Sequence, residues 1–190
     1  MFLYGDNLLN MKKILGMLAL TLTFIACDND VVFNDPSFGA QRLSVLNDSI
    51  SLPTYEHWNA TDFSAKVLNG SIIITGSDSL TTVELRTASY EYGAKYDMGI
   101  LDTDRASLTY KNEEGEIVEP IYVTGENVGS GYIVYAPKEK QVEGTITGEF
   151  HITFVNNSVV DVESFKRDKM KNSRTYSKGR FYRVPIELAK

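Results

Sequence analysis

Cys27 is the only cysteine in the chain, and the residues before it specify a covalent chemistry. Lys12 and Lys13 supply positive charge, an uncharged apolar run covers residues 14–25, and Ala26 directly precedes the cysteine. This order is typical of a bacterial lipoprotein export signal. We therefore predict cleavage before Cys27 and attachment of acyl chains such as palmitate to its sulfur, which anchors the mature protein in a membrane.

A transmembrane helix is the main alternative for residues 11–26. Such a helix needs roughly 20 apolar residues to cross about 30 Å of hydrocarbon, and this run is shorter. Phe24 departs from the leucine that is commoner three positions before the lipidated cysteine. Residues 1–10 precede a better start at Met11 and look like an upstream mis-start. The order of charge, apolar run and cysteine favours the export signal over the helix.

Cleavage divides the chain into a signal peptide (residues 1–26), a lipidated tether (27–37) and a domain (38–190). The acidic start of the tether, Asp28-Asn29-Asp30, is either a sorting cue for the outer face of the cell or a solvated spacer. The signal removes two of 19 basic and one of 25 acidic residues, which leaves 17 against 24 and a net charge of −7. This acidic balance argues against a nucleic-acid partner.

Candidate catalytic and metal-binding residues are sparse. The two histidines, His57 and His151, are too far apart in sequence for a local metal motif, and the chain has no Gly-x-Ser-x-Gly elbow. Asp97, Asp102 and Asp104 could gather oxygen ligands for calcium, but they lack the spacing of an EF-hand loop and fit a turn better. We therefore expect no catalytic residue, no metal site and no cofactor; a hydrolase is a remote alternative.

Aromatic side chains are candidates for contact with a ligand. Trp58 lies in a loop-like stretch, and Tyr90 and Tyr92 have the spacing of neighbours on one face of a strand. Tyr96 and Tyr110 add rings in the same region of the sequence. These rings are either a sugar-binding platform or part of the core and its rim.

Basic residues are concentrated near the C-terminus, where eight of them stand against Asp168 within eighteen residues. Lys166, Arg167, Lys169 and Lys171 are the candidates for contact with an anionic surface such as phosphate-bearing lipid head groups. The alternative is a solvated loop. Residues 161–178 are predicted to be a long charged hairpin loop, with one or two helical turns at residues 164–171 as the alternative.

The remaining pattern is that of short strands separated by turn residues. Alternation is plainest in Gly148–Val155, where Phe150, Ile152 and Phe154 point one way and Glu149, His151 and Thr153 the other. Further strands are expected at residues 71–75, 82–87, 106–110, 120–124, 131–136, 145–155 and 180–188. No helical periodicity follows Cys27. We predict an all-β domain, a single antiparallel β-sandwich or flattened barrel of about eight to ten strands.

The order of these segments resembles a family of lipoproteins from the Bacteroidota, domain of unknown function 6252. The likeness covers residues 38–190 and rests on short elements in sequence: Phe38-Gly39-Ala40, Trp58-Asn59-Ala60, Ile72–Gly76, Val83–Leu85, Gly93–Tyr96, Gly131–Tyr135, Ile146–Phe150 and Gly179–Phe181. The resemblance implies a β-rich domain on a lipid anchor and brings no catalytic residues.

In such bacteria an Asp-Ser-aliphatic triplet is an O-glycosylation signal, and Ser49 and Ser79 occupy such triplets. Taken together, we expect a non-catalytic lipoprotein of the cell envelope, anchored in the outer membrane through Cys27 and facing the periplasm or the surface. Its predicted role is binding of a ligand such as a glycan; the alternative is an accessory subunit that docks on an envelope protein complex.

Overall fold

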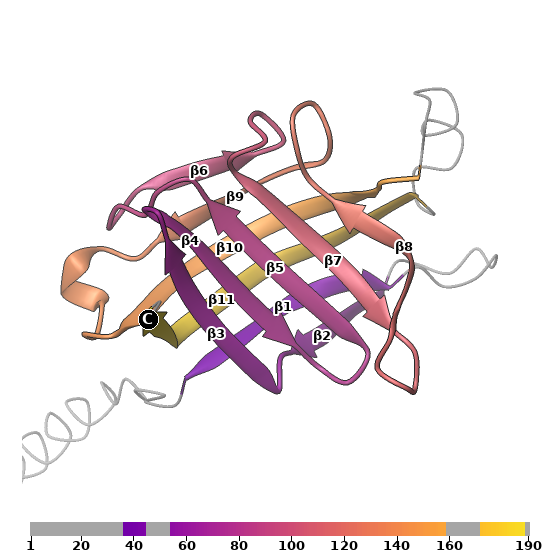
Figure 1. Ribbon diagram of the computed structural model, residues 1–190, viewed down its shortest axis with the longest axis horizontal. Coiled ribbons are helices and arrows are strands. Elements are labelled where there is room, and N and C mark those ends of the chain that lie inside the picture. The colour runs from indigo at the N-terminus through magenta and orange to yellow at the C-terminus, as the bar shows by residue number, and fades with distance from the viewer. Residues whose placement is uncertain (1–35, 45–53, 159–171, 189–190) are drawn as a thin grey trace, which may run out of the picture. The chain divides into compact units, whose positions relative to one another are not determined.

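Strands account for nearly all of the regular structure in the computed structural model of the chain (Figure 1). The structure describes residues 36–44, 54–158 and 172–188. The predicted signal peptide, Cys27, nearly all of the tether and Ser49 lie outside these ranges, as do Lys166, Arg167, Lys169 and Lys171. Within these ranges no helix has the length and apolar character that a membrane crossing requires.

The strands are β1 (Ser37–Ser44), β2 (Thr54–Asn59), β3 (Asp62–Leu68), β4 (Ser71–Ser77), β5 (Thr81–Thr87), β6 (Lys95–Met98), β7 (Arg105–Lys111), β8 (Ile117–Val123), β9 (Ser130–Tyr135), β10 (Thr145–Asn156) and β11 (Ser173–Leu188). A short 3-10 helix, η1 (Lys138–Lys140), precedes β10. The described part of the chain therefore holds eleven strands, slightly more than the expected eight to ten.

Alternation of buried and exposed residues explains why these segments form strands. In β4, Ile72 and Ile74 are fully buried, and the alternate residues Ser71, Ile73 and Thr75 are partly exposed. In β10, Phe150, Ile152 and Phe154 are each at most 1% exposed, as the period of two predicts. The β-branched and aromatic residues in these strands favour the extended backbone. The predicted all-β class is confirmed.

The strands form one hydrogen-bonded sheet in the order β2-β1-β11-β3-β4-β5-β7-β8-β10-β9-β6. An additional pairing of β10 with β11 joins strands that are far apart in this order, so the sheet folds back on itself. In Figure 1, β3, β4, β5 and β7 lie in front and cross over a second layer that contains β9, β10, β11, β1 and β2. We call this second layer the back layer.

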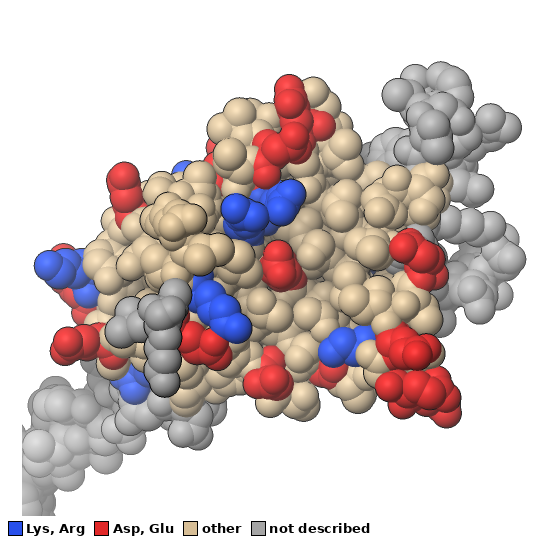
Figure 2. Space-filling model, in the orientation of Figure 1, with Lys and Arg blue, Asp and Glu red and all other residues tan. Residues whose placement is uncertain are grey.

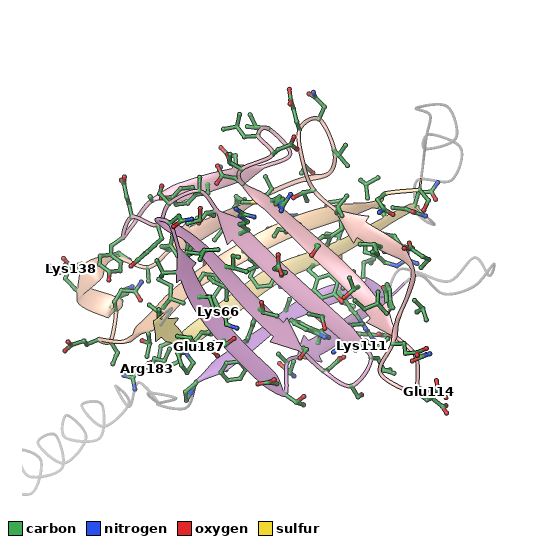
Figure 3. The ribbon with its side chains drawn as sticks, in the orientation of Figure 1. Lys66, Lys111, Glu114, Lys138, Arg183 and Glu187 are labelled. Carbon is green, nitrogen blue, oxygen red and sulfur yellow. The ribbon has the colours of Figure 1, made fainter. Side chains whose placement is uncertain are left out.

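One pairing is parallel, whereas the other strand pairs are antiparallel as expected. The C-terminal end of β11 pairs with β3 in parallel. Lys66 and Glu187 are register partners there, and their side chains form an ion pair with 3.2 Å between Nζ and Oε2 (Figure 3). β11 has sixteen residues, which is long enough to pair with β1 and β10 first and then reach the front layer.

The predicted loop at residues 161–178 is wrong in its last part. β11 begins at Ser173, so Arg174 and Lys178 belong to a strand, while residues 161–171 lie outside the described ranges. The strand was hidden in the sequence because a bulge interrupts its alternation. Lys178 has a φ of 49°, and the register shifts at this point against both β1 and β10. A bulge inserts one extra residue and breaks the period of two.

Aromatic rings from the back layer pack together in the core. Phe38 on β1 makes edge contacts with Trp58 at 5.5 Å, Phe150 at 5.6 Å and Phe181 at 6.3 Å between ring centroids. Gly76 on β4 leaves room for this cluster, because a Cβ there would overlap the Phe38 ring. Each buried ring removes about 150–250 Å² from water, so this cluster supplies much of the hydrophobic stabilisation.

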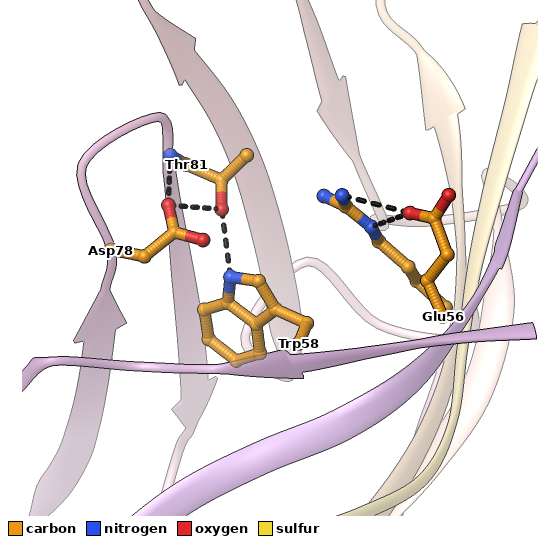
Figure 4. Close-up of polar contacts among 5 residues, drawn as sticks. Glu56, Trp58, Asp78 and Thr81 are labelled. Atoms are coloured by element: carbon orange, nitrogen blue, oxygen red, sulfur yellow. Dashed lines mark hydrogen bonds and ion pairs between the residues drawn. The ribbon is translucent and has the colours of Figure 1, made fainter.

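The indole of Trp58 has a buried polar partner as well. Its Nε1 donates to Oγ1 of Thr81 at 2.8 Å, and that hydroxyl donates to Oδ1 of Asp78 at 2.9 Å (Figure 4). The same Oδ1 accepts a hydrogen bond from the backbone N–H of Thr81 at 2.6 Å. These bonds satisfy the indole N–H away from water and attach β2 to the turn between β4 and β5.

Candidate functional site

Trp58, predicted as a ligand contact, lies in the core. Its side chain is 2% exposed and packs edge-on against Phe38 and, at 5.5 Å between centroids, against Tyr176. A ring that is buried in this way presents no face to a ligand. The structure therefore gives Trp58 a packing role.

Tyr90, Tyr92 and Tyr96 do come together, around a fourth ring, Tyr135. Tyr135 is buried and makes edge contacts with Tyr96 at 5.5 Å and with Tyr90 at 6.4 Å. Tyr90 contacts Tyr92, whose side chain is 46% exposed. Burial raises the pKa of Tyr135, and its hydroxyl hydrogen-bonds to Thr87 Oγ1 at 2.7 Å. We name Tyr90, Tyr92, Tyr96 and Tyr135 the tyrosine cluster; only Tyr92 projects strongly from it.

Tyr110 lies elsewhere and packs against Tyr122 at 5.9 Å. It lines a hollow of about 230 Å³ that also contains Arg42, Glu56, Arg174 and Tyr176. Arg42 is bound to Glu56 through Nε and Nη2, each at 2.9 Å (Figure 4). Burial raises the pKa of Tyr176 to about 12. The Arg42–Glu56 ion pair occupies part of the polar lining of this hollow.

The three aspartates named above have separate structural partners. Asp97 lies in β6 and forms an ion pair with Lys95. Asp102 accepts from the backbone N–H of Glu126 at 2.9 Å, and Asp104 accepts from that of Ala88 at 2.8 Å. No group of three metal-ligating side chains suited to hold an ion occurs in the described part of the chain. Two of the three carboxylates thus stabilise loops.

Ser79 is exposed at the turn between β4 and β5. Asp78 holds this turn, since its Oδ1 accepts from the backbone N–H groups of Leu80 and Thr81. The hydroxyl of Ser79 is accessible for modification on this geometry, while Ser49 lies outside the described residues.

One hollowed surface of the described residues was not predicted from the sequence. It lies on the outer face of the back layer and consists of two hollows, of about 520 Å³ and about 320 Å³. Both are lined by Glu149 and Arg180, so they adjoin. We call the two together the outer groove. Its lining residues are Ser37, Gly39, Gln41, His57, Asn59, Tyr132, Val134, Pro137, Lys140, Thr147, Glu149, His151, Lys178, Arg180 and Tyr182, among others.

Strand register explains how residues so distant in sequence meet. Reading across the back layer from β6 to β2, register partners form one uninterrupted row: Lys95, Val134, Glu149, Arg180, Gly39 and Asn59. Side chains at partner positions of neighbouring strands point to the same face of the sheet. The row therefore crosses six strands and carries side chains from five of them, with Gly39 as the exception, on one surface.

A second row lies beside the first. Asp97, Tyr132 and His151 are partners on β6, β9 and β10, and Gln41 and His57 are partners on β1 and β2. Both histidines of the chain thus line the same hollow. His151 lies on the polar face of its strand, as its alternation indicates, whereas His57 belongs to β2 and not to a loop.

Tyr132 is held in place from two neighbours. Its ring stacks on His151 with 6.0 Å between centroids and 20° between planes. The Nζ of Lys95 lies 5.2 Å from the centre of the same ring and is paired with Asp97. Such contacts fix the ring orientation, so a ligand meets a preformed surface.

Two backbone features shape the middle of the groove. Gly39 has no side chain between Asn59 and Arg180, and a Cβ there would lie 2.5 Å from Asn59 Oδ1. The bulge in β11 brings Ser177 and Lys178 to the outer face as consecutive residues, with Gly179 buried after them. Bulges commonly re-aim a side chain at functional positions. Here the bulge adds a lysine to the groove.

The other face of the described domain differs from the groove. Figure 2 shows this face, over β3, β4, β5 and β7, with acidic and basic side chains interspersed. The groove combines rings, amides, imidazoles and three basic groups with a single carboxylate. It is therefore the surface on which the described residues concentrate groups that can bind a polar ligand.

Comparison with known proteins identifies the family of this chain but gives no information about an activity. The family model for a domain of unknown function, DUF6252, matches residues 53–185, from just before β2 into β11. Of the segments that carried the sequence resemblance, only Phe38-Gly39-Ala40 precedes this range. No curated protein and no solved structure gives a significant match. The matched range covers most of the chain, and the protein therefore belongs to the DUF6252 family.

Proposed function

We propose that the domain is a non-catalytic binding module that takes an extended polar polymer, such as a glycan, into the outer groove. The observation that carries this proposal is the continuity of the two hollows across the back layer, through Glu149 and Arg180. Small-molecule sites are usually enclosed cavities that bury most of the ligand. A long groove on an outer sheet face suits a chain molecule better.

The lining chemistry supports a sugar polymer. Asn59, Gln41 and the two histidines can exchange hydrogen bonds with hydroxyl groups. Tyr132 and Tyr182 add rings in the two hollows, and the ring of Tyr132 is already fixed by its stack on His151. Fixed polar groups and rings reduce the entropy that binding costs.

The proposal contains no catalytic step. Glycoside hydrolysis generally requires two carboxyl groups on either side of the scissile bond. Glu149 is the one carboxylate among the described residues that line the groove. We assign it an electrostatic role in binding.

The proposed setting is the cell envelope. Cleavage before Cys27 and acylation of its sulfur would attach the domain to the outer membrane through the tether of residues 27–37, with the domain in the periplasm or at the surface. In this setting the lipid on Cys27 holds the domain at the membrane, and the domain in turn retains the bound polymer there.

The test is binding of the full-length protein to a broad set of purified polysaccharides, with Tyr132→Ala and Tyr92→Ala compared. The proposal predicts saturable binding that Tyr132→Ala weakens at least tenfold and Tyr92→Ala leaves unchanged. If Tyr92→Ala abolishes polysaccharide binding and Tyr132→Ala does not, the binding site lies at the tyrosine cluster and not in the outer groove. Absence of binding across the whole set would remove the proposal.

A second candidate, docking on an envelope protein complex, has its own observation. Ile100, Leu101 and Val128 are 60%, 55% and 37% exposed on two loops. These loops are joined by hydrogen bonds, from Asn127 N to Gly99 O at 3.0 Å and from Glu126 N to Asp102 Oδ1 at 2.9 Å. An exposed apolar tip with a fixed shape is typical of a protein contact.

Crosslinking in intact membranes tests this second candidate. It predicts one stoichiometric partner that is lost in a Leu101→Ser variant and retained in a Leu80→Ser variant, since Leu80 is also exposed but lies in the turn after β4. Recovery of the protein without a crosslinked partner would count against it.

A further inference from the structure

We propose that the outer groove selects an anionic polymer, a glycan that carries carboxylate or sulfate groups, over a neutral one. This inference rests on the proposed function and narrows its ligand class. It follows from the charges that line the groove, from the backbone geometry that places them, and from the single acid among them.

The groove is basic in an acidic protein. Lys140, Lys178 and Arg180 line it against Glu149, a local balance of +2, whereas the whole chain has a net charge of −6. Charge of one sign in a concave surface raises the local concentration of oppositely charged ligands. Attraction of this kind requires the basic groups to be uncompensated within the protein.

The ion pairs of the described residues lie elsewhere. They include Arg42–Glu56, Lys66–Glu187 and Lys95–Asp97, and none involves Lys140, Lys178 or Arg180. All three groove cations are exposed. Arg180 and Glu149 are register partners on β11 and β10, but they form no ion pair. The positive charges of the groove are therefore available to a ligand.

Geometry favours recognition by Arg180 in particular. Its other register partner is Gly39, which leaves the β1 side of the arginine without a side chain. A guanidinium offers a planar fork of N–H donors that matches a carboxylate or sulfate with two parallel hydrogen bonds. Lys178, placed at the bulge two residues earlier, adds a second cation on the same face.

A hollowed surface fits a chain better than a flat bilayer. Anionic lipid head groups carry similar charges, yet they form a plane that cannot enter hollows of about 520 Å³ and about 320 Å³. We therefore assign the site to a soluble polymer, and vesicles serve as the competing probe.

The experiment compares matched polymers on the full-length protein. Polygalacturonate is set against its fully methyl-esterified form, and chondroitin sulfate against its desulfated form, each at several salt concentrations. We expect at least one acidic member to bind tenfold or more tightly than its neutral counterpart, with the difference shrinking as salt rises, because ions screen charges beyond about 8 Å at physiological ionic strength.

Three variants test whether the preference for acidic polymers arises from the charged residues of the outer groove. Arg180→Gln and Lys178→Gln should each weaken binding of the acidic polymer about tenfold and weaken binding of the neutral polymer by much less. Glu149→Gln should tighten acidic binding several-fold, which a damaged fold could not produce. Lys111→Gln is the matched control, because it removes the same charge from β7, on the front layer (Figure 3).

The outcomes are distinct. Equal binding of acidic and neutral partners would overturn the inference while the proposed function stands. Binding of neither kind would remove both. Binding to vesicles of anionic phospholipid without binding to any acidic polymer would also overturn the inference and would point to a membrane surface instead.

Discussion

The rings of Tyr132 and His151 lie nearly parallel on neighbouring strands, 6.0 Å apart between centroids, in the larger hollow of the outer groove. They are register partners on β9 and β10, so the pairing of these two strands sets their separation. The stack is therefore a product of strand register, and it fixes a surface that a ligand can use.

Alanine variants of the two histidines can be compared to measure how much the Tyr132–His151 stack contributes to stability. Removal of the His151 ring should lower the free energy of unfolding by about 0.5–1.5 kcal/mol, the usual contribution of an aromatic pair. His57→Ala should change it by less, since His57 makes no ring contact with a described residue. Guanidinium unfolding of both variants measures this; equal effects would show that the stack contributes nothing specific.

Thr81 is predicted to matter for its hydroxyl. Thr81→Val removes the acceptor of the Trp58 indole N–H and leaves that donor buried without a partner. An unsatisfied buried donor costs about 1–3 kcal/mol. The neighbouring Thr82→Val change, on the outer face of β5, should be nearly neutral. Urea unfolding curves of the two variants give the comparison, and a stable Thr81→Val protein would contradict the role of this bond.

Gly76 should not tolerate a methyl group. A Cβ at this position overlaps the Phe38 ring, so Gly76→Ala forces the aromatic cluster to shift. Overpacking of this kind typically costs about 1–3 kcal/mol. A smaller side chain in the Phe38→Leu variant should make the added Gly76→Ala change less costly, so a double-mutant cycle by chemical unfolding should show coupling between the two. If the changes in unfolding free energy of the two single variants simply add in the double variant, Gly76 and Phe38 do not interact, and the prediction is wrong.

Alkaline pH should weaken the fold through Tyr176. Burial raises the pKa of Tyr176 from 10 to about 12, so the unfolded chain loses this proton at lower pH than the folded chain does. Stability linked to Tyr176 is therefore complete below pH 10 and falls as pH rises from 10 towards 12. Tyr176→Phe should flatten the decline in unfolding free energy over this interval. If the unfolding free energy of Tyr176→Phe falls as steeply with pH as that of the wild type, other titrating groups cause the decline.

Tyr176→Phe should also be tolerated at neutral pH. The Tyr176 hydroxyl is buried, and its polar neighbour among the described residues, the Arg42 guanidinium, does not meet hydrogen-bond geometry. Its removal relieves the cost of keeping a polar group away from water. Unfolding at pH 7 therefore serves as the internal control for the alkaline measurement.

The lipid anchor is predicted from residues 11–27 alone. Cells fed an alkyne-tagged fatty acid should label the wild-type protein, and Cys27→Ser should abolish the label because no other cysteine is present. Mass spectrometry of the wild-type N-terminus should find an acylated Cys27. A labelled Cys27→Ser protein, or an intact segment of residues 1–26 in mature protein, would contradict the export signal.

The alternation of buried and exposed residues allows the all-β class to be predicted from the sequence, but it does not reveal every strand. β4, β5 and β10 carry regular patterns of buried residues, and the sequence identifies them. β2 (Thr54–Asn59) has polar residues on both sides of Trp58, so it reads as a loop although its ring is in the core. β11 is interrupted by the bulge at Lys178. Periodicity fails where one buried ring or one bulge decides the structure.

The groove was beyond prediction for a different reason. Most of its residues come from β1, β2, β9, β10 and β11, with Ala136, Pro137 and Lys140 from the segment before β10, and each of them alone is an ordinary residue. Only the strand order, with β11 between β1 and β10, brings Gly39, Arg180 and Glu149 into one row. Local sequence holds no signal for such long-range pairing, whereas it does hold the alternation that placed His151 on the outer face.

Chemical-shift mapping of the protein by NMR during titration with the tightest-binding polysaccharide tests the binding claim most directly. We predict shifts in the backbone amides of Gly39, His57, Tyr132, His151 and Arg180, across five strands of the back layer, and little change on β4, β5 and β7. Shifts confined to Tyr90–Tyr96 or to the tip at Ile100, Leu101 and Val128, with the back layer silent, would contradict the assignment of the outer groove as the binding site.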